Sequence, residues 1–309
     1  MGHGMAGVEH AREVSAGKRF EFGRNWHRFL ALLDEDRIAA AERSLQRMLE
    51  AERLDGQRFL DVGSGSGLFS LAAVRLGAHV HSFDYDPQSM ACTRFLKESY
   101  APDAPWTIES GSILDTRFLA TLGQFDIVYA WGVLHHTGAM WDALENVTSL
   151  VHEGGRLYLA IYNDQGSRSQ RWKLVKGAYN RTPAALRPCI HFPIIFYHEA
   201  RSFLGDLARG RNPLRPWITK KAFRGMSKWH DWLDWIGGYP FEVAKPEEIF
   251  DFYRGRGFVM TQLKTEGGTL NEFVFVKGPP PVDPPGQWER QEQSKAGMSQ
   301  GQRFIETPR

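Results

Sequence analysis

The stretch Asp61-Val62-Gly63-Ser64-Gly65-Ser66-Gly67 decides the fold of this 309-residue chain. It follows a short apolar run, Arg58–Val62, and it precedes residues 68–76, whose apolar pattern predicts a helix. Glycines between a strand and a helix let the backbone turn tightly and approach a ligand closely, and the amides at the helix start are hydrogen-bond donors. The stretch therefore predicts a strand–loop–helix unit that binds a ligand at the loop.

An acid after the next predicted strand narrows the ligand class. Asp84 ends the strand predicted at Val80–Phe83, and an acid in that place can accept hydrogen bonds from both hydroxyls of a ribose. A dinucleotide site would have the pattern Gly-x-Gly-x-x-Gly, whereas this chain has Leu68 at the last of those positions. The spacing therefore favours a different nucleoside ligand.

Strand and helix patterns alternate along the first half of the chain. Further strands are predicted at 106–109, 125–131 and 156–162, with helices at 88–100 and 141–151 between them. The run Phe125–Trp131 is apolar apart from Asp126, as expected of a strand covered on both faces. A helix at 246–257 and strands at 258–263 and 272–277 end the pattern. Together these elements predict an α/β fold with a Rossmann-like, doubly wound parallel sheet.

Three features together resemble the class I S-adenosylmethionine-dependent methyltransferases, and most of all the branch of the ubiquinone-biosynthesis O-methyltransferases. They are the loop Asp61–Gly67, the acid Asp84, and the strand 125–131 with the Gly-Val-Leu-His-His sequence of residues 132–136 after it. The resemblance implies a seven-stranded sheet whose last strand runs antiparallel, and S-adenosylmethionine as the cofactor. It also implies roles for the cofactor-binding residues: Asp61, Gly63, Ser64, Gly65 and Gly67 around the methionine part, Asp84 on the ribose, Tyr85, Ser112 and Ile113 at the adenine, and Trp131 at the methyl-transfer site.

Two histidines follow the strand at 125–131 directly. His135 and His136 are candidates for a general base that removes a proton from an acceptor hydroxyl, because histidine titrates near neutral pH. The alternative is that both are packing or capping residues. Tyr162 and Asn163 follow the next strand at the same edge of the sheet and are candidate acceptor contacts, or else part of a turn that ends the strand.

The segment 224–242 mixes aromatic, acidic and glycine residues. Trp229, Trp232, Leu233 and Ile236 have helical spacing, which favours packing on the sheet. Asp231, Tyr239 and Glu242 remain candidate acceptor contacts, since acceptor pockets are commonly lined by aromatic groups with a few polar ones.

A strongly basic segment separates the two halves of the sheet pattern. Residues 165–225 contain 13 Lys or Arg and two acids, Glu199 and Asp206, although the whole chain has a net charge of only +2. The segment suits an anionic acceptor, with Arg168 near the loop at Tyr162, but a solvated helical face, RNA or an anionic membrane surface also fits it. We find no histidine or cysteine cluster with metal-ligand spacing and expect no metal.

The predicted organisation follows from these patterns. We expect a flexible lead-in at 1–18, a helical segment at 19–56, a cofactor-binding core at 57–164, a helical, basic and aromatic insertion at 165–245, closing elements at 246–277 and a disordered proline-rich tail at 278–309. Two cysteines and no apolar run in Met1–Lys18 predict a cytoplasmic protein without a signal peptide. The predicted activity is methyl transfer to a small molecule, preferably at oxygen. An RNA or protein acceptor and a non-catalytic, cofactor-binding regulatory module are the alternatives.

Overall fold

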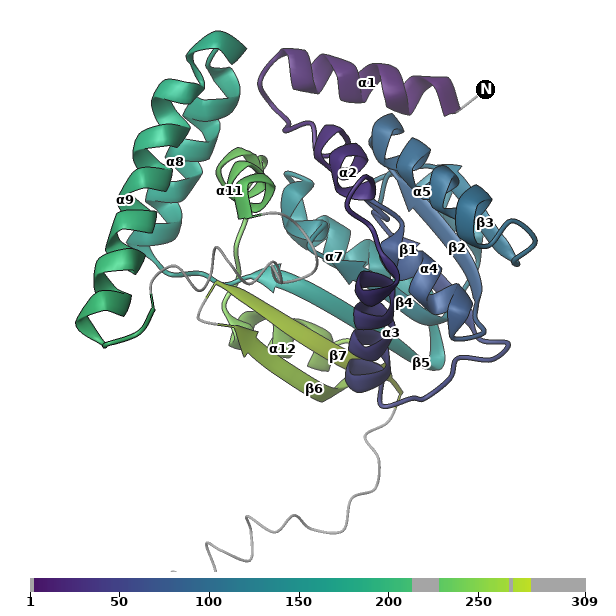
Figure 1. The fold of residues 1–309 in the computed structure, drawn as a ribbon. Coiled ribbons are helices and arrows are strands. Elements are labelled where there is room, and N and C mark those ends of the chain that lie inside the picture. The colour runs from purple at the N-terminus through teal and green to yellow at the C-terminus, as the bar shows by residue number, and fades with distance from the viewer. Residues whose placement is uncertain (1–2, 213–227, 267–268, 279–309) are drawn as a thin grey trace, which may run out of the picture.

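The computed structural model describes residues 3–212, 228–266 and 269–278, and its centre is one seven-stranded sheet (Figure 1). Strand order is β3-β2-β1-β4-β5-β7-β6, in which β1 to β5 run parallel and β7 pairs antiparallel with both β5 and β6. The predicted α/β fold with an antiparallel last strand is confirmed. The strands are β1 (Arg58–Val62), β2 (His79–Asp84), β3 (Trp106–Ser110), β4 (Phe125–Trp131), β5 (Val151–Tyr162), β6 (Phe258–Glu266) and β7 (Leu270–Lys277).

Helices cover both faces of the sheet. One apolar core joins the sheet to α3 (Glu35–Leu49), α4 (Leu68–Arg75) and α5 (Pro87–Tyr100), and the other joins it to α6 (Thr116–Leu122), α7 (Met140–Ser149) and α12 (Pro246–Arg254). Along β4, Ile127 and Tyr129 enter the first core while Val128 and Ala130 enter the second, because successive side chains of a strand point to opposite faces. The apolar composition of β4 follows from this double burial.

Helix α3 shows how local sequence sets an element. Asp34 accepts a hydrogen bond from the backbone N–H of Arg37 and so caps the helix start. The apolar face of the helix is buried, with Ile38 and Leu45 fully inaccessible. The helix ends at Leu49, before the end of the helical segment predicted at 19–56, because Glu50 adopts a left-handed conformation with φ 49°.

The N-terminal segment differs from the prediction of a flexible lead-in at 1–18. Residues 3–15 form helix α1 (His3–Ser15), and a further helix, α2 (Gly23–Leu30), packs against α5. Helix α1 contains two glycines and little apolar periodicity, so its sequence gives no pattern by which to predict it. Its contacts are tertiary: His10 is buried beside Asp86 and against the ring of Tyr85.

The insertion between β5 and α12 is helical over the residues described. It comprises α8 (Ser167–Arg181), a 3₁₀ turn η2 (Ala184–Leu186), α9 (Pro188–Ala208) and α11 (Lys228–Gly237). Figure 1 shows α8 and α9 side by side at the edge of the molecule, and their rings meet where Trp172 contacts His198. Within the described part of the chain, no helix has the length and apolar character needed to cross a bilayer. The tail predicted at 278–309 lies outside the described residues from 279 on.

Candidate functional site

The glycine loop predicted from sequence joins β1 to α4. Gly63, Gly65 and Gly67 have φ values of 69°, 57° and 82°, a region that glycine adopts without the cost paid by other residues. A side chain at Gly63 would also collide with its surroundings, since its Cβ would lie 2.3 Å from Cγ2 of Val133. Both geometry and space therefore require glycine at position 63.

Asp84 lies at the end of β2, beside this loop. One carboxylate oxygen accepts from the backbone N–H of Gly65 at 2.9 Å and the other from that of Asp86 at 2.8 Å. Burial, helped by the nearby negative charge of Asp86, raises the pKa of Asp84 to about 7, even though the backbone N–H groups of Asp86, Gly65 and Tyr85 lower it. Each oxygen still has acceptor capacity, so the carboxylate can bind two further donors such as ribose hydroxyls.

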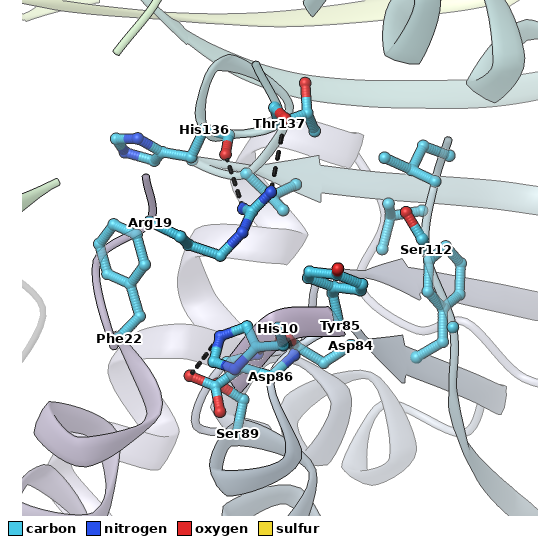
Figure 2. Close-up of a pocket in the computed structure, with 18 of the residues that line it drawn as sticks. His10, Arg19, Phe22, Asp84, Tyr85, Asp86, Ser89, Ser112, His136 and Thr137 are labelled. Atoms are coloured by element: carbon cyan, nitrogen blue, oxygen red, sulfur yellow. Dashed lines mark hydrogen bonds and ion pairs between the residues drawn. The ribbon is translucent and has the colours of Figure 1, made fainter. Parts of the chain in front are cut away.

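A cavity of about 160 Å³ opens over the loop and Asp84 (Figure 2). It lies where the parallel strands end, which is where open α/β sheets bind ligands. Seven of the ten predicted cofactor-binding residues line it: Gly63, Gly65, Asp84, Tyr85, Ser112, Ile113 and Trp131.

The other three predicted residues lie beneath the lining and support it. Asp61 is buried and accepts a hydrogen bond from the hydroxyl of Ser70. The hydroxyl of Ser64 lies 2.9 Å from that of Thr93 in α5. A Cβ at Gly67 would lie 2.8 Å from Cα of Thr93, so Gly67 lets α4 and α5 approach closely.

Sequence reasoning missed the N-terminal wall of the cavity. His10, Arg19, Phe20, Phe22 and Trp26 all line it. Arg19 donates to the backbone carbonyl of His136 at 2.9 Å and lies over the ring of Tyr85, 4.9 Å from its centre. These contacts hold the N-terminal segment across the cavity. The many aromatic residues at 20–29 are the one sequence feature that could have indicated this wall. They do not show, however, that these rings point toward the cavity.

Neither histidine has the properties of a base near neutral pH. Burial is the main cause that lowers the pKa of His136 to about 3, and burial also holds the pKa of His135 well below the usual histidine value. His136 Nδ1 lies 2.6 Å from the carbonyl oxygen of Pro240 and must donate to it, and its ring points away from Asp84 in Figure 2. His135 lies outside the cavity lining, with its ring 4.1 Å from that of Tyr162. The geometry corresponds to the alternative, two packing histidines.

Of the six predicted acceptor contacts, the structure describes the side chains of five, and it brings none of these five to this cavity. Tyr162 packs on His135 and Phe241, Asn163 bridges to Ala244, and Arg168 is exposed on α8. Tyr239 holds the N-terminal segment through its carbonyl oxygen, which accepts from Phe20 N–H. Glu242 accepts from the N–H groups of Gly138 and Met140 at the start of α7. Asp231 belongs to α11, and its side chain lies outside the described residues.

Trp131 has a buried partner that sequence could not show. Its Nε1 donates to Glu272 of β7 at 3.0 Å, and Glu272 also accepts from the Tyr158 hydroxyl and, at 2.9 Å, from Lys264. Burial alone would raise the pKa of Glu272, but these three hydrogen bonds outweigh it and lower the pKa. Trp131 and Glu272 also line a second cavity, of about 230 Å³, with Phe69 and Lys264.

Metal ligands were not expected from the sequence. In the residues for which the structure gives positions, no three His, Cys, Asp or Glu side chains gather as a metal site would require.

The close approach at Gly63 can be tested by mutation. We expect Gly63→Ala to lower the free energy of unfolding by about 1–3 kcal/mol more than Gly154→Ala does. Both glycines have positive φ, at 69° and 78°, but a Cβ at Gly154 would meet nothing within 4 Å. Urea unfolding measures the free energy of unfolding of both variants. The difference between them reports the collision with Val133, because both variants share the cost of placing alanine at a positive φ. Equal losses would mean that the loop accommodates a side chain.

Comparison with known proteins defines the class. Residues 60–157 match the family model described as a methyltransferase domain. This part of the chain is therefore a methyltransferase domain, and the resemblance to the class I S-adenosylmethionine-dependent methyltransferases is confirmed.

Particular relatives match only part of the chain. It is 32% identical over 110 residues to the ubiquinone biosynthesis O-methyltransferase of Xanthomonas campestris pv. campestris (strain B100), and 27% identical over 117 residues to the protein of that name from Aeromonas salmonicida (strain A449). Each match covers 36% of this chain and 45% of the relative, so the chain spans less than half the length of these curated relatives. Among solved structures, magnesium protoporphyrin IX methyltransferase from Synechocystis PCC 6803 with bound SAH has a TM-score of 0.47 and 14% identity, covering 78% of this chain and 83% of that one.

Proposed function

We propose that this protein is an enzyme that transfers a methyl group from S-adenosylmethionine to the oxygen of a small molecule. The observation that carries the proposal is the cavity in which the glycine loop, Asp84 and Ile113 come together at the carboxyl ends of the strands. The names of the curated relatives, ubiquinone biosynthesis O-methyltransferases, support oxygen as the atom methylated.

The residues present fit the cofactor. Gly63 and Gly65 line the cavity, and Asp84 offers a carboxylate with free acceptor capacity to the two ribose hydroxyls. Ile113 and Tyr85 supply apolar surface for the adenine. The Ser112 hydroxyl accepts from Leu114 N–H at 3.2 Å, which leaves its own proton for the ring. When bound, S-adenosylmethionine supplies an electrophilic methyl group.

The N-terminal wall excludes water and favours one kind of acceptor. Arg19, Phe22 and Trp26 cover the loop, so the reaction would proceed in a site shielded from solvent. His136, with a pKa of about 3, is too weak a base to deprotonate an aliphatic alcohol. We therefore propose an acceptor that ionises readily by itself, such as a phenol or a carboxylic acid.

Methyl-labelled S-adenosylmethionine tests the proposal directly. The purified chain is incubated with the labelled cofactor and a cell extract depleted of its own methyltransferases, and the products are sorted by size and nuclease sensitivity. We expect label in the small-molecule fraction, in a product whose methyl group is lost on ether or ester cleavage. Label in RNA or protein would replace the proposed acceptor class. Cofactor binding without label in any fraction, with a known methyltransferase active in the same extract, would count against catalysis.

A further inference from the structure

Helix α9 presents large apolar side chains to solvent. Phe192 is 54% exposed, Phe196 76%, Phe203 42% and Leu207 59%. Buried contacts of this helix lie on its other side, where His191 and Ile195 pack toward α8 and α11. Exposed apolar residues scattered singly over a surface are ordinary, but a continuous set on one helix indicates a surface that something covers.

The exposed residues form one stripe along α9. At about 100° per residue, Phe192, Phe196, Phe203 and Leu207 fall within about 60° of one another around the helix axis. Tyr197 and Leu204, which are 61% and 62% exposed, extend this stripe to a width of about 140°. We refer to these six residues as the α9 stripe. Two further exposed leucines lie nearby in the chain, Leu174 on α8 and Leu186 in η2.

The segment that carries the α9 stripe is positively charged. Residues 165–212 contain nine Lys or Arg and two acids, Glu199 and Asp206. The two acids are half-buried, and Glu199 accepts a hydrogen bond from Trp232 at 2.9 Å. Seven of the nine basic side chains are exposed: Arg168, Arg171, Lys173, Arg181, Arg201, Arg209 and Arg211.

We infer that the α8–α9 pair docks on an anionic lipid bilayer, with the α9 stripe inserted at the level of the headgroups. An exposed apolar helix face within a basic segment is typical of helices that lie in the membrane interface. Glu199, Arg201 and Asp206 within α9 fit a helix lying flat, because a spanning helix would carry them into the hydrocarbon. A second copy of the chain would bring two positive surfaces together, whereas anionic headgroups attract them.

Flotation with lipid vesicles tests this inference on the full chain, independently of methyl transfer. We expect the protein to float with vesicles of phosphatidylcholine and phosphatidylglycerol, to bind phosphatidylcholine vesicles more weakly, and to be released by high salt. The double variant Phe196→Ser with Leu207→Ser should bind the anionic vesicles at least about tenfold more weakly. The matched control is Phe95→Ser, since Phe95 of α5 is 51% exposed and lies outside the insertion.

The other results would each overturn the inference. Equal vesicle binding by the double variant and the control would place any membrane contact elsewhere. No binding to anionic vesicles by the unmodified chain, together with a dimer in sedimentation that the double variant abolishes, would show that a second copy covers the α9 stripe. All of the replaced side chains are exposed, so we expect both variants to unfold at nearly the same temperature as the unmodified protein. Thermal unfolding checks in this way that the binding comparison is made between folded proteins.

Discussion

Replacing Asp84 with alanine is expected to weaken the binding of S-adenosylmethionine by about 10- to 100-fold. Hydrogen bonds to a charged group contribute about 1.5–3 kcal/mol each, and Asp84 offers acceptor capacity on both oxygens at the edge of the cavity. Titration calorimetry with the cofactor or with its demethylated product measures the change. An affinity within threefold of the unmodified protein would remove Asp84 from the ribose role.

The same residue gives the binding a pH dependence with a definite sign. Without ligand the pKa of Asp84 is raised to about 7, and donor hydroxyls would stabilise its charged form. Affinity should therefore rise as the pH increases through 7 and level off above it, and Asp84→Asn should abolish this dependence. The stability of the ligand-free protein has the opposite pH dependence. The contribution of Asp84 to stability is fully present below the pKa of this group in the unfolded chain, and it is lost as the pH rises through about 7.

Much of the sheet could be predicted because its information is local. The strand β1, the glycine loop and Asp84 are recognisable within 27 residues of sequence, and the structure brings them together as expected. The loop needs glycine for backbone reasons, and a strand covered on both faces needs apolar residues whatever its neighbours are. Such requirements can be read before the fold is known.

The rest of the site depends on contacts between distant parts of the chain. Arg19 reaches the carbonyl of His136 across 117 residues, and Trp131 reaches Glu272 across 141. Residue type did not reveal these pairings, and it left two roles open for His135 and His136, whose pKa values are lowered by burial. The protonation state of a side chain is a property of its surroundings, which only the folded chain supplies.

The contact between Glu272 and Trp131 is expected to contribute strongly to stability. Glu272→Ala should lower the free energy of unfolding by about 3–5 kcal/mol. The Glu272 side chain is 4% exposed, and removing it breaks three hydrogen bonds, from the Trp131 N–H, the Tyr158 hydroxyl and the Lys264 ammonium. Urea unfolding at neutral pH measures the loss. Because the pKa of Glu272 is lowered in the folded protein, its contribution exists above the ordinary carboxyl pKa and disappears as the pH falls, so the difference between variant and unmodified protein should shrink in acid.

A surface carboxylate in an ion pair provides the matched control. Glu145 is 54% exposed and pairs with Arg256 at 2.6 Å, so Glu145→Ala should cost less than about 1 kcal/mol. Glu272→Gln should fall between the two, since the amide keeps one acceptor oxygen for Trp131 or Tyr158 but loses the charge that attracts Lys264. If Glu272→Ala and Glu145→Ala lose the same stability, the network does not hold the indole. A much larger loss of stability in Glu272→Ala than in Glu145→Ala would show that the network stabilises the fold. If S-adenosylmethionine also binds Glu272→Ala less tightly than it binds Glu272→Gln, the Glu272 carboxylate positions Trp131, which lines the cavity.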